Sequence, residues 1–120
     1  GVPGLSDNIR VRSILGRFLE HSRIYAFCND GDTDLYIGSA DLMHRNLDRR
    51  VEALVRITDP AMVEDLEWLV THCASDEVSS WHLRPDGSWE RHLVDADGNR
   101  LEDIQDSLMV RARSRVKGRH

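Results

Sequence analysis

Two short apolar runs joined by a cluster of turn-forming residues constrain the fold of this chain more than any other feature. Residues 23–28 alternate in the manner of a β-strand, and a second such run follows at 34–39. Residues 29–32, with the sequence Asn-Asp-Gly-Asp, predict a tight turn between them, so we expect a β-hairpin. A third run, 50–57, is rich in Val, Leu and Ile and predicts another strand. Because these strands are apolar on both faces, we expect the sheet to be covered.

Helices and a second hairpin are predicted around this sheet. Apolar residues recur at near-helical spacing from Ser6 or Asp7 to His21, which predicts a first helix. The side chains of Trp81 and Trp89 are expected to pack across the second hairpin. The other expected elements are a helix beginning at Asp59-Pro60, a hairpin of strands 78–84 and 88–94, and a final helix over 101–116. This pattern predicts one domain, 1–120, of the α/β class, with α+β left open.

The composition of the chain is typical of a soluble globular domain. Of its 120 residues, 40% are apolar and 31% are charged. No apolar run approaches the roughly 18 residues of a membrane-spanning helix, so we expect a cytoplasmic protein, with peripheral membrane association left open. Cys28 and Cys73 lack the spacing of metal ligands or of a redox pair, so we expect reduced, buried thiols.

Charge is distributed unevenly along the chain. Residues 1–57 carry eight Arg against eight acidic residues, 58–106 carry three against thirteen, and 107–120 carry five bases and no acid. Every basic residue except Lys117 is Arg, whose planar fork binds phosphate oxygens two at a time. Codon bias is the alternative explanation for this preference. The basic tail could contact a polyanion, the acidic middle of the chain, or only solvent.

The first 57 residues contain a candidate site for phosphoryl chemistry. His21 and Arg23 form a His-x-base step, and a small-residue turn crowded with arginines follows at 38–50. An imidazolium can donate a proton to a phosphate oxygen, and Arg neutralises the charge on a transferring phosphoryl group. Ser39 and Asp41 end the second predicted strand, so we expect their N–H groups and the serine hydroxyl to face the same crevice as His21. Because His21 also ends the first predicted helix, a simple helix C-cap is an equal alternative.

The His-Ser-Arg step at 21–23, followed by Ile-Gly-Ser-Ala-Asp at 37–41, resembles the half-site of the phospholipase D superfamily. That half-site carries a His-x-Lys step and a Gly-Ser-x-Asn turn, so Arg23 replaces Lys and Asp41 replaces Asn. Both departures argue against an independent phospholipase or nuclease. A narrower resemblance is to the C-terminal catalytic domain of the phospholipase-D-like polyphosphate kinases. It is carried by the blocks 6–14, 17–25, 36–43 and 45–52, in order and with the expected spacing.

This resemblance implies a fold and a reaction. The implied fold is a phospholipase D-like mixed sheet flanked by helices and truncated at its N-terminus, with the motifs in 1–57, a helix, hairpin and helix in 58–110, and a basic tail at 111–120. The implied reaction is the reversible transfer of the terminal phosphate of ATP to inorganic polyphosphate through a phosphohistidine, with Mg²⁺. The phosphorylated histidine and most Mg²⁺ ligands are implied to lie in a preceding domain, so we expect the fragment alone to be inactive.

The resemblance also implies roles and partners. His21 is the implied catalytic residue, Leu42 and His44 depart from the family pattern, and no metal ligand is expected in this chain. The implied ATP- and phosphate-binding residues are His21, Arg23, Ser39, Asp41, Arg45 and Asn46. Expected partners are ATP or ADP, polyphosphate, upstream domains of the same enzyme and further copies of it, but no nucleic acid. Two alternatives stay open: a non-catalytic polyanion-binding or regulatory module, and a phospholipase D-like phosphodiesterase active as a dimer.

Overall fold

The chain forms two compact units, seen in a computed structural model that describes residues 1–117. One unit contains Gly1–Leu19 and the chain from Cys73 onward, and the other contains Glu20–His72. Within the described residues, each unit holds one three-stranded sheet, and helices follow the strands along the chain. The expected mixture of helices and strands is therefore confirmed.

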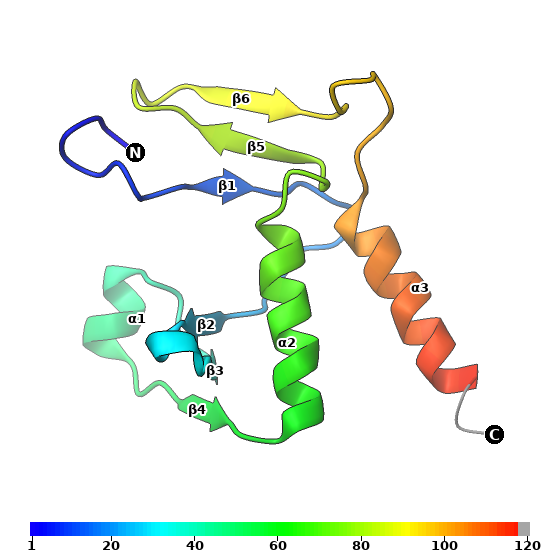
Figure 1. The fold of residues 1–120 in the computed structure, drawn as a ribbon. Coiled ribbons are helices and arrows are strands. Elements are labelled where there is room, and N and C mark those ends of the chain that lie inside the picture. Colours follow the sequence, from blue (N-terminus) through cyan, green and yellow to red (C-terminus); the bar gives the residue numbers. More distant parts are fainter. Residues whose placement is uncertain (118–120) are drawn as a thin grey trace. The chain divides into compact units, whose positions relative to one another are not determined.

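The sheet of the Glu20–His72 unit consists of β2 (Ile24–Phe27), β3 (Asp34–Gly38) and β4 (Leu54–Ile57), all antiparallel, with β3 in the middle (Figure 1). The turn between β2 and β3 is the short 3₁₀ segment η1 (Asn29–Gly31). Its backbone is left-handed, with φ of 33°, 56° and 96° at Asn29, Asp30 and Gly31. Asn, Asp and Gly are the residues that tolerate this conformation, so the turn chemistry explains the predicted hairpin, which is confirmed.

The expected cover over both faces of this sheet is not found within the described residues. Leu35, at the centre of β3, is completely buried. Phe27 and Val55, however, are 56% and 54% exposed, and Ile37, which pairs with Val55, is also exposed. The described elements therefore bury the middle of the sheet and leave apolar side chains exposed on it.

The segment between β3 and β4 differs from the expectation of a turn followed directly by a strand. A helix, α1 (His44–Arg49), occupies it, and β4 begins at Leu54 rather than at residue 50. The Nδ1 of His44 lies 2.6 Å from a carboxylate oxygen of Asp48, one turn further along α1. The helix α2 (Pro60–Cys73) follows as predicted, and the carboxylate of Asp59 accepts the N–H groups of Ala61 and Met62 at its start.

The other unit is built on β1 (Arg12–Ser13), β5 (Ser80–Leu83) and β6 (Trp89–His92), which are antiparallel with β5 in the middle (Figure 1). The helix α3 (Ile104–Lys117) ends the described chain. The second hairpin and the last helix are therefore confirmed. Trp81 lies opposite Arg91, whose guanidinium is 5.4 Å from the ring centroid, so this cation–π contact takes the place of the expected packing of Trp81 on Trp89.

The predicted first helix, from Ser6 or Asp7 to His21, is wrong. Arg12 and Ser13 form β1, and the rest of the segment is turn or loop. The amide of the buried Gln105 explains part of this outcome, because it accepts the N–H of Phe18 at 2.9 Å and donates to the carbonyl of Phe18 at 2.8 Å. These long-range bonds replace helical ones, and the Gln105 side chain also occupies the space that a side chain at Gly16 would need.

Three smaller expectations are resolved within the described residues. Both cysteines are thiols outside any disulfide, as predicted, but Cys28 is exposed and Cys73 is only half-buried. The first part of the basic tail belongs to α3, and residues 118–120 lie outside the described residues. No helix among residues 1–117 combines the length and the apolar character needed to cross a bilayer.

Candidate functional site

The hairpin of β2 and β3 places the two sequence motifs at one edge of the Glu20–His72 unit. Arg23 directly precedes β2 and Gly38 ends β3, and because the strands are antiparallel these positions meet: the N–H of Gly38 donates to the carbonyl of Arg23 at 3.0 Å. A Cβ at Gly38 would lie 3.1 Å from the Leu54 side chain and 3.3 Å from the ring of Tyr25. Glycine therefore permits the close approach of the strands that brings the motifs together.

The guanidinium of Arg23 connects the two motifs. Its Nε and Nη2 donate to the same carboxylate oxygen of Asp41, at 2.8 and 2.5 Å, and its Nη1 donates to the backbone carbonyl of His21. The Arg23 side chain is 25% exposed, so this pair is partly shielded from water. One side chain thus holds the backbone of the His-x-base step against the turn that follows β3.

Asp41 is kept ionised by its neighbours. The hydrogen bond from Arg23 is the main cause that lowers the pKa of Asp41 below its usual range, and partial burial opposes it. The charge of Arg23, a hydrogen bond from Asn46 and the charge of Arg45 lower this pKa further. The carboxylate therefore serves as a fixed negative anchor for the arginines around it.

Asn46 is the most buried polar residue of this site, at 2% exposure, and it lies on α1. Its Nδ2 donates to Asp41 at 3.4 Å, whereas its Oδ1 has no hydrogen-bond partner among the described residues. An unpaired buried amide oxygen is costly, so it marks a place where a donor from outside these residues is expected.

Ser39 does not open onto a shared crevice in the way the sequence predicted. Its hydroxyl donates to Glu52 at 2.5 Å and accepts the N–H of Ala53, and its own N–H donates to the carbonyl of Ala53. The segment leading into β4 therefore takes up these groups. Glu52 was missed as a site residue, although it lies in one of the sequence blocks that carried the resemblance.

His21 lies in an exposed loop, and no helix ends at this residue. The argument from a helix dipole is therefore wrong, and with it the alternative that His21 is a simple helix C-cap. Arg45 lies on α1, close enough to Asp41 to lower its pKa, and Arg49 and Arg50 are exposed further along the same segment.

The structure thus brings Arg23, Asp41 and Asn46 together, with Arg45 nearby. His21 is connected to this group by the hydrogen bond from Arg23 to its backbone carbonyl. Ser39 belongs instead to a pair with Glu52. This arrangement offers a fixed wall with exposed cationic and imidazole side chains, which is suited to binding an anion. Within residues 1–117, no group of three or more His, Cys, Asp or Glu side chains is placed to hold a metal ion.

Comparison with known proteins connects this chain to one family. Residues 1–103 match the family model described as polyphosphate kinase C-terminal domain 2. A polyphosphate kinase of Streptomyces coelicolor is 60% identical over 118 residues, which is 98% of this chain and 16% of that protein. A polyphosphate kinase of Thermosynechococcus vestitus is 49% identical over 120 residues, which is 100% of this chain and again 16% of that protein.

The solved structures give the same relationship. The crystal structure of polyphosphate kinase from Porphyromonas gingivalis matches 98% of this chain with a TM-score of 0.81 at 26% sequence identity. The match covers 18% of that longer chain. The present chain therefore spans less than a fifth of the proteins it resembles, and most of their length has no counterpart in it.

Proposed function

Because this chain belongs to the polyphosphate kinase C-terminal domain family, we propose that it is part of an enzyme that transfers the terminal phosphate of ATP reversibly to inorganic polyphosphate. The transfer proceeds through a phosphohistidine carried by a preceding domain. Since the chain corresponds to 16% of its relatives, the remaining parts of the active site come from other regions, and the segment alone is inactive.

The role of His21 is to contact the phosphates of the nucleotide and to donate a proton or stabilise the transferring group. This role is supported by the position of the Arg23 guanidinium. It donates one hydrogen bond to the backbone carbonyl of His21 and another to the carboxylate of Asp41, and so links the two segments. A catalytic group must be held in place to be effective, and this clamp fixes the chain at His21 while the imidazole stays exposed.

The exposed arginines of the Glu20–His72 unit bind the phosphate groups. Arg45 is exposed near the Asp41 carboxylate and has no hydrogen bond or ion pair among the described residues, whereas the guanidinium of Arg23 is bonded to Asp41 and to the His21 carbonyl. Asp41 and Asn46 complete the wall of the site. The Asn46 Oδ1, which has no hydrogen-bond partner among the described residues, accepts a hydrogen bond from the bound nucleotide or from a preceding domain.

Mg²⁺ is bound mainly by residues outside this segment. The described residues gather no set of three carboxylate, imidazole or thiolate ligands, so they do not fit the ion by themselves. When bound with ATP, Mg²⁺ neutralises charge on the phosphate oxygens.

The open apolar surface of the β2–β4 sheet points to partners within the same enzyme. Phe27, Ile37 and Val55 are exposed on a sheet whose centre is buried. Upstream domains or a second copy of the enzyme cover this surface, as expected for a segment of a larger assembly. Because ATP is the phosphate donor, we place the enzyme in the cytoplasm.

The test of this function is the synthesis of polyphosphate by the full-length enzyme that carries this segment. His21→Ala is expected to reduce the rate by at least about 100-fold, because general acid–base groups contribute 10²–10⁴ in rate. Folding should be unaffected, since His21 is exposed in a loop. His44→Ala is the matched control, because His44 is also exposed and its side chain pairs with Asp48 on the same helix rather than with Arg23 or Asp41. Near-normal synthesis by His21→Ala would overturn the role of His21.

The second candidate function is a non-catalytic polyanion-binding or regulatory module. The observation in its favour is the helix α3, whose last part includes Arg111, Arg113 and Arg115. Under this alternative, polyphosphate binding would be lost when residues 111–120 are removed and would be unchanged by His21→Ala.

A further inference from the structure

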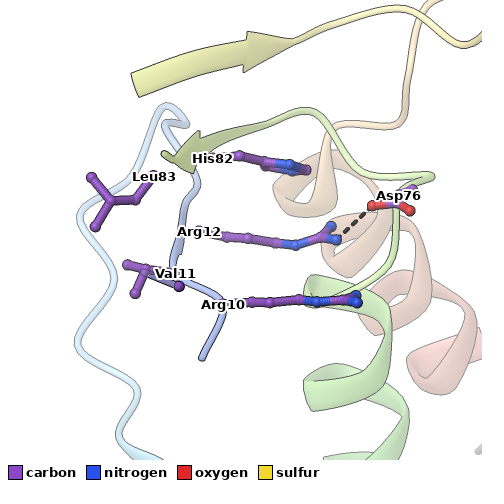
Figure 2. Close-up of a pocket in the computed structure, with 7 residues that line it drawn as sticks. Arg10, Val11, Arg12, Asp76, His82 and Leu83 are labelled. Atoms are coloured by element: carbon purple, nitrogen blue, oxygen red, sulfur yellow. Dashed lines mark hydrogen bonds and ion pairs between the residues drawn. The ribbon is translucent and has the colours of Figure 1, made fainter. Parts of the chain in front are cut away.

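The unit built on β1, β5 and β6 contains a pocket of its own. Its volume is about 260 Å³. Figure 2 shows side chains from the β1 region, from β5 and from the loop after α2 around it. Its lining residues are Gly1, Arg10, Val11, Arg12, Asp76, His82 and Leu83. All of them belong to one unit, and the residues around His21 belong to the other.

The backbone explains why basic side chains collect here. Arg10 and Arg12 are two positions apart on an extended segment, so they project to the same side. Arg12 lies directly opposite His82 in the register of β1 and β5, which places the imidazole beside the two arginines. Figure 2 shows the three side chains lying next to one another and pointing in the same direction.

Arg12 is fixed in position by bonds at its tip. Its Nη1 donates to the carbonyl of Ser75 at 2.6 Å, its Nη2 donates to Asp76 at 2.5 Å, and its side chain is only 16% exposed. Arg12 therefore forms a rigid wall of the pocket. A substitution at Arg12 would disturb the fold as well as any site, because it would leave the Ser75 carbonyl without its donor.

The pocket carries more positive than negative charge. Asp76 is its one carboxylate, and Arg12 already bonds it. Arg10 has no hydrogen bond or ion pair among the described residues, although its charge helps to lower the pKa of Asp76. His82 lies against His92 and its Nε2 is 3.0 Å from the hydroxyl of Ser80. The two arginines and one carboxylate leave a net positive charge, with the Arg10 fork free to bind an anion.

We propose that this pocket is a second oxyanion site that binds a short stretch of inorganic polyphosphate through Arg10, with Arg12 as its fixed wall. The planar fork of Arg10 can hold two phosphate oxygens at once. The pocket is smaller than the roughly 300–1,000 Å³ of typical small-molecule sites, and its lining offers no Phe, Tyr or Trp on which a base could stack. It therefore suits a few phosphoryl groups better than a nucleotide. This site goes beyond the proposed transfer reaction, because its lining residues belong to the unit that does not contain His21.

The experiment measures binding of inorganic tripolyphosphate to the full-length enzyme by calorimetry, in a His21→Ala background that prevents turnover. Arg10→Gln should weaken this binding by roughly tenfold, the effect of losing one charge-assisted interaction. Arg100→Gln is the control, because Arg100 is an exposed arginine of the same unit outside the pocket. Asp76→Asn should strengthen binding, since it removes the negative charge from the pocket.

Two outcomes would overturn the proposal. Equal tripolyphosphate affinity in Arg10→Gln and Arg100→Gln would show that the pocket does not bind the anion. A matching loss of ATP affinity in Arg10→Gln would show that the pocket accepts a nucleotide instead. The proposed transfer reaction fails on a different result, because it requires polyphosphate synthesis by the unsubstituted enzyme, which neither binding outcome changes.

Discussion

Arg23 and Asp41 depart together from the phospholipase D pattern of Lys and Asn, and the structure gives a reason for the joint change. Arg23 makes three contacts at once, two to the Asp41 carboxylate and one to the carbonyl of His21. Two of them converge on one oxygen, which suits a guanidinium with its fixed donors better than a single ammonium. The carboxylate of Asp41 accepts these hydrogen bonds, and the bond from Arg23 lowers the pKa of Asp41.

This pairing predicts that lysine cannot replace Arg23. Arg23→Lys should lower polyphosphate synthesis by the full-length enzyme by roughly 10- to 100-fold, because small misplacements of catalytic groups carry costs of that order. Steady-state rates at saturating ATP provide the measurement. Arg56→Lys is the control, since Arg56 forms an exposed ion pair with Asp34 in the same sheet. Equal rates for the two variants would show that the fork of Arg23 is not needed.

Among the secondary-structure elements, β3 carries the stability of the Glu20–His72 unit. It lies between β2 and β4, and its Leu35 is completely buried. Leu35→Ala should lower the free energy of unfolding by about 2–5 kcal/mol, through lost burial and the cavity left behind. Val55→Ala, at a position that is 54% exposed, should cost about 1 kcal/mol or less. Urea denaturation of the chain followed by circular dichroism measures both, and similar losses would contradict this view of β3.

The elements that could be predicted are those whose cause is local. The turns at 29–32 and 85–87 contain residues suited to left-handed backbone, and Asp59-Pro60 is a helix start, so both hairpins and α2 follow from the sequence. The segment before His21 could not be predicted in this way. Its conformation depends on Gln105, 87 positions away from Phe18, and a helical spacing of apolar residues does not reveal such a partner.

The same difference between local causes and distant partners explains which residues of the candidate site could be predicted. Arg23, Asp41 and Asn46 were predicted as site residues; the hairpin brings Arg23 to Asp41, and α1 adds Asn46. Glu52 was not predicted, although its partner Ser39 is only 13 positions away. The pocket around Arg10 was not predicted because it depends on partners from a distant segment. Arg12 bonds Asp76 across 64 positions, and only the antiparallel register of β1 and β5 sets His82 beside it.

For the whole molecule, the two units divide the functions proposed for the chain. The Glu20–His72 unit carries His21 and its arginine wall, whereas the other unit carries the pocket at Arg10. The chain matches 16% of the length of its relatives, and the sheet around β3 leaves apolar side chains open. Both observations fit a segment that completes an active site begun elsewhere in a longer enzyme.

In the proposed reaction, this segment contributes a histidine that assists phosphoryl transfer without itself becoming phosphorylated. The most direct measurement labels the full-length enzyme with ATP that carries a radioactive terminal phosphate, and then maps the labelled histidine by digestion under alkaline conditions. The label is expected on a histidine outside residues 1–120, with none on the peptide that contains His21. Stable label on His21 would contradict the claim.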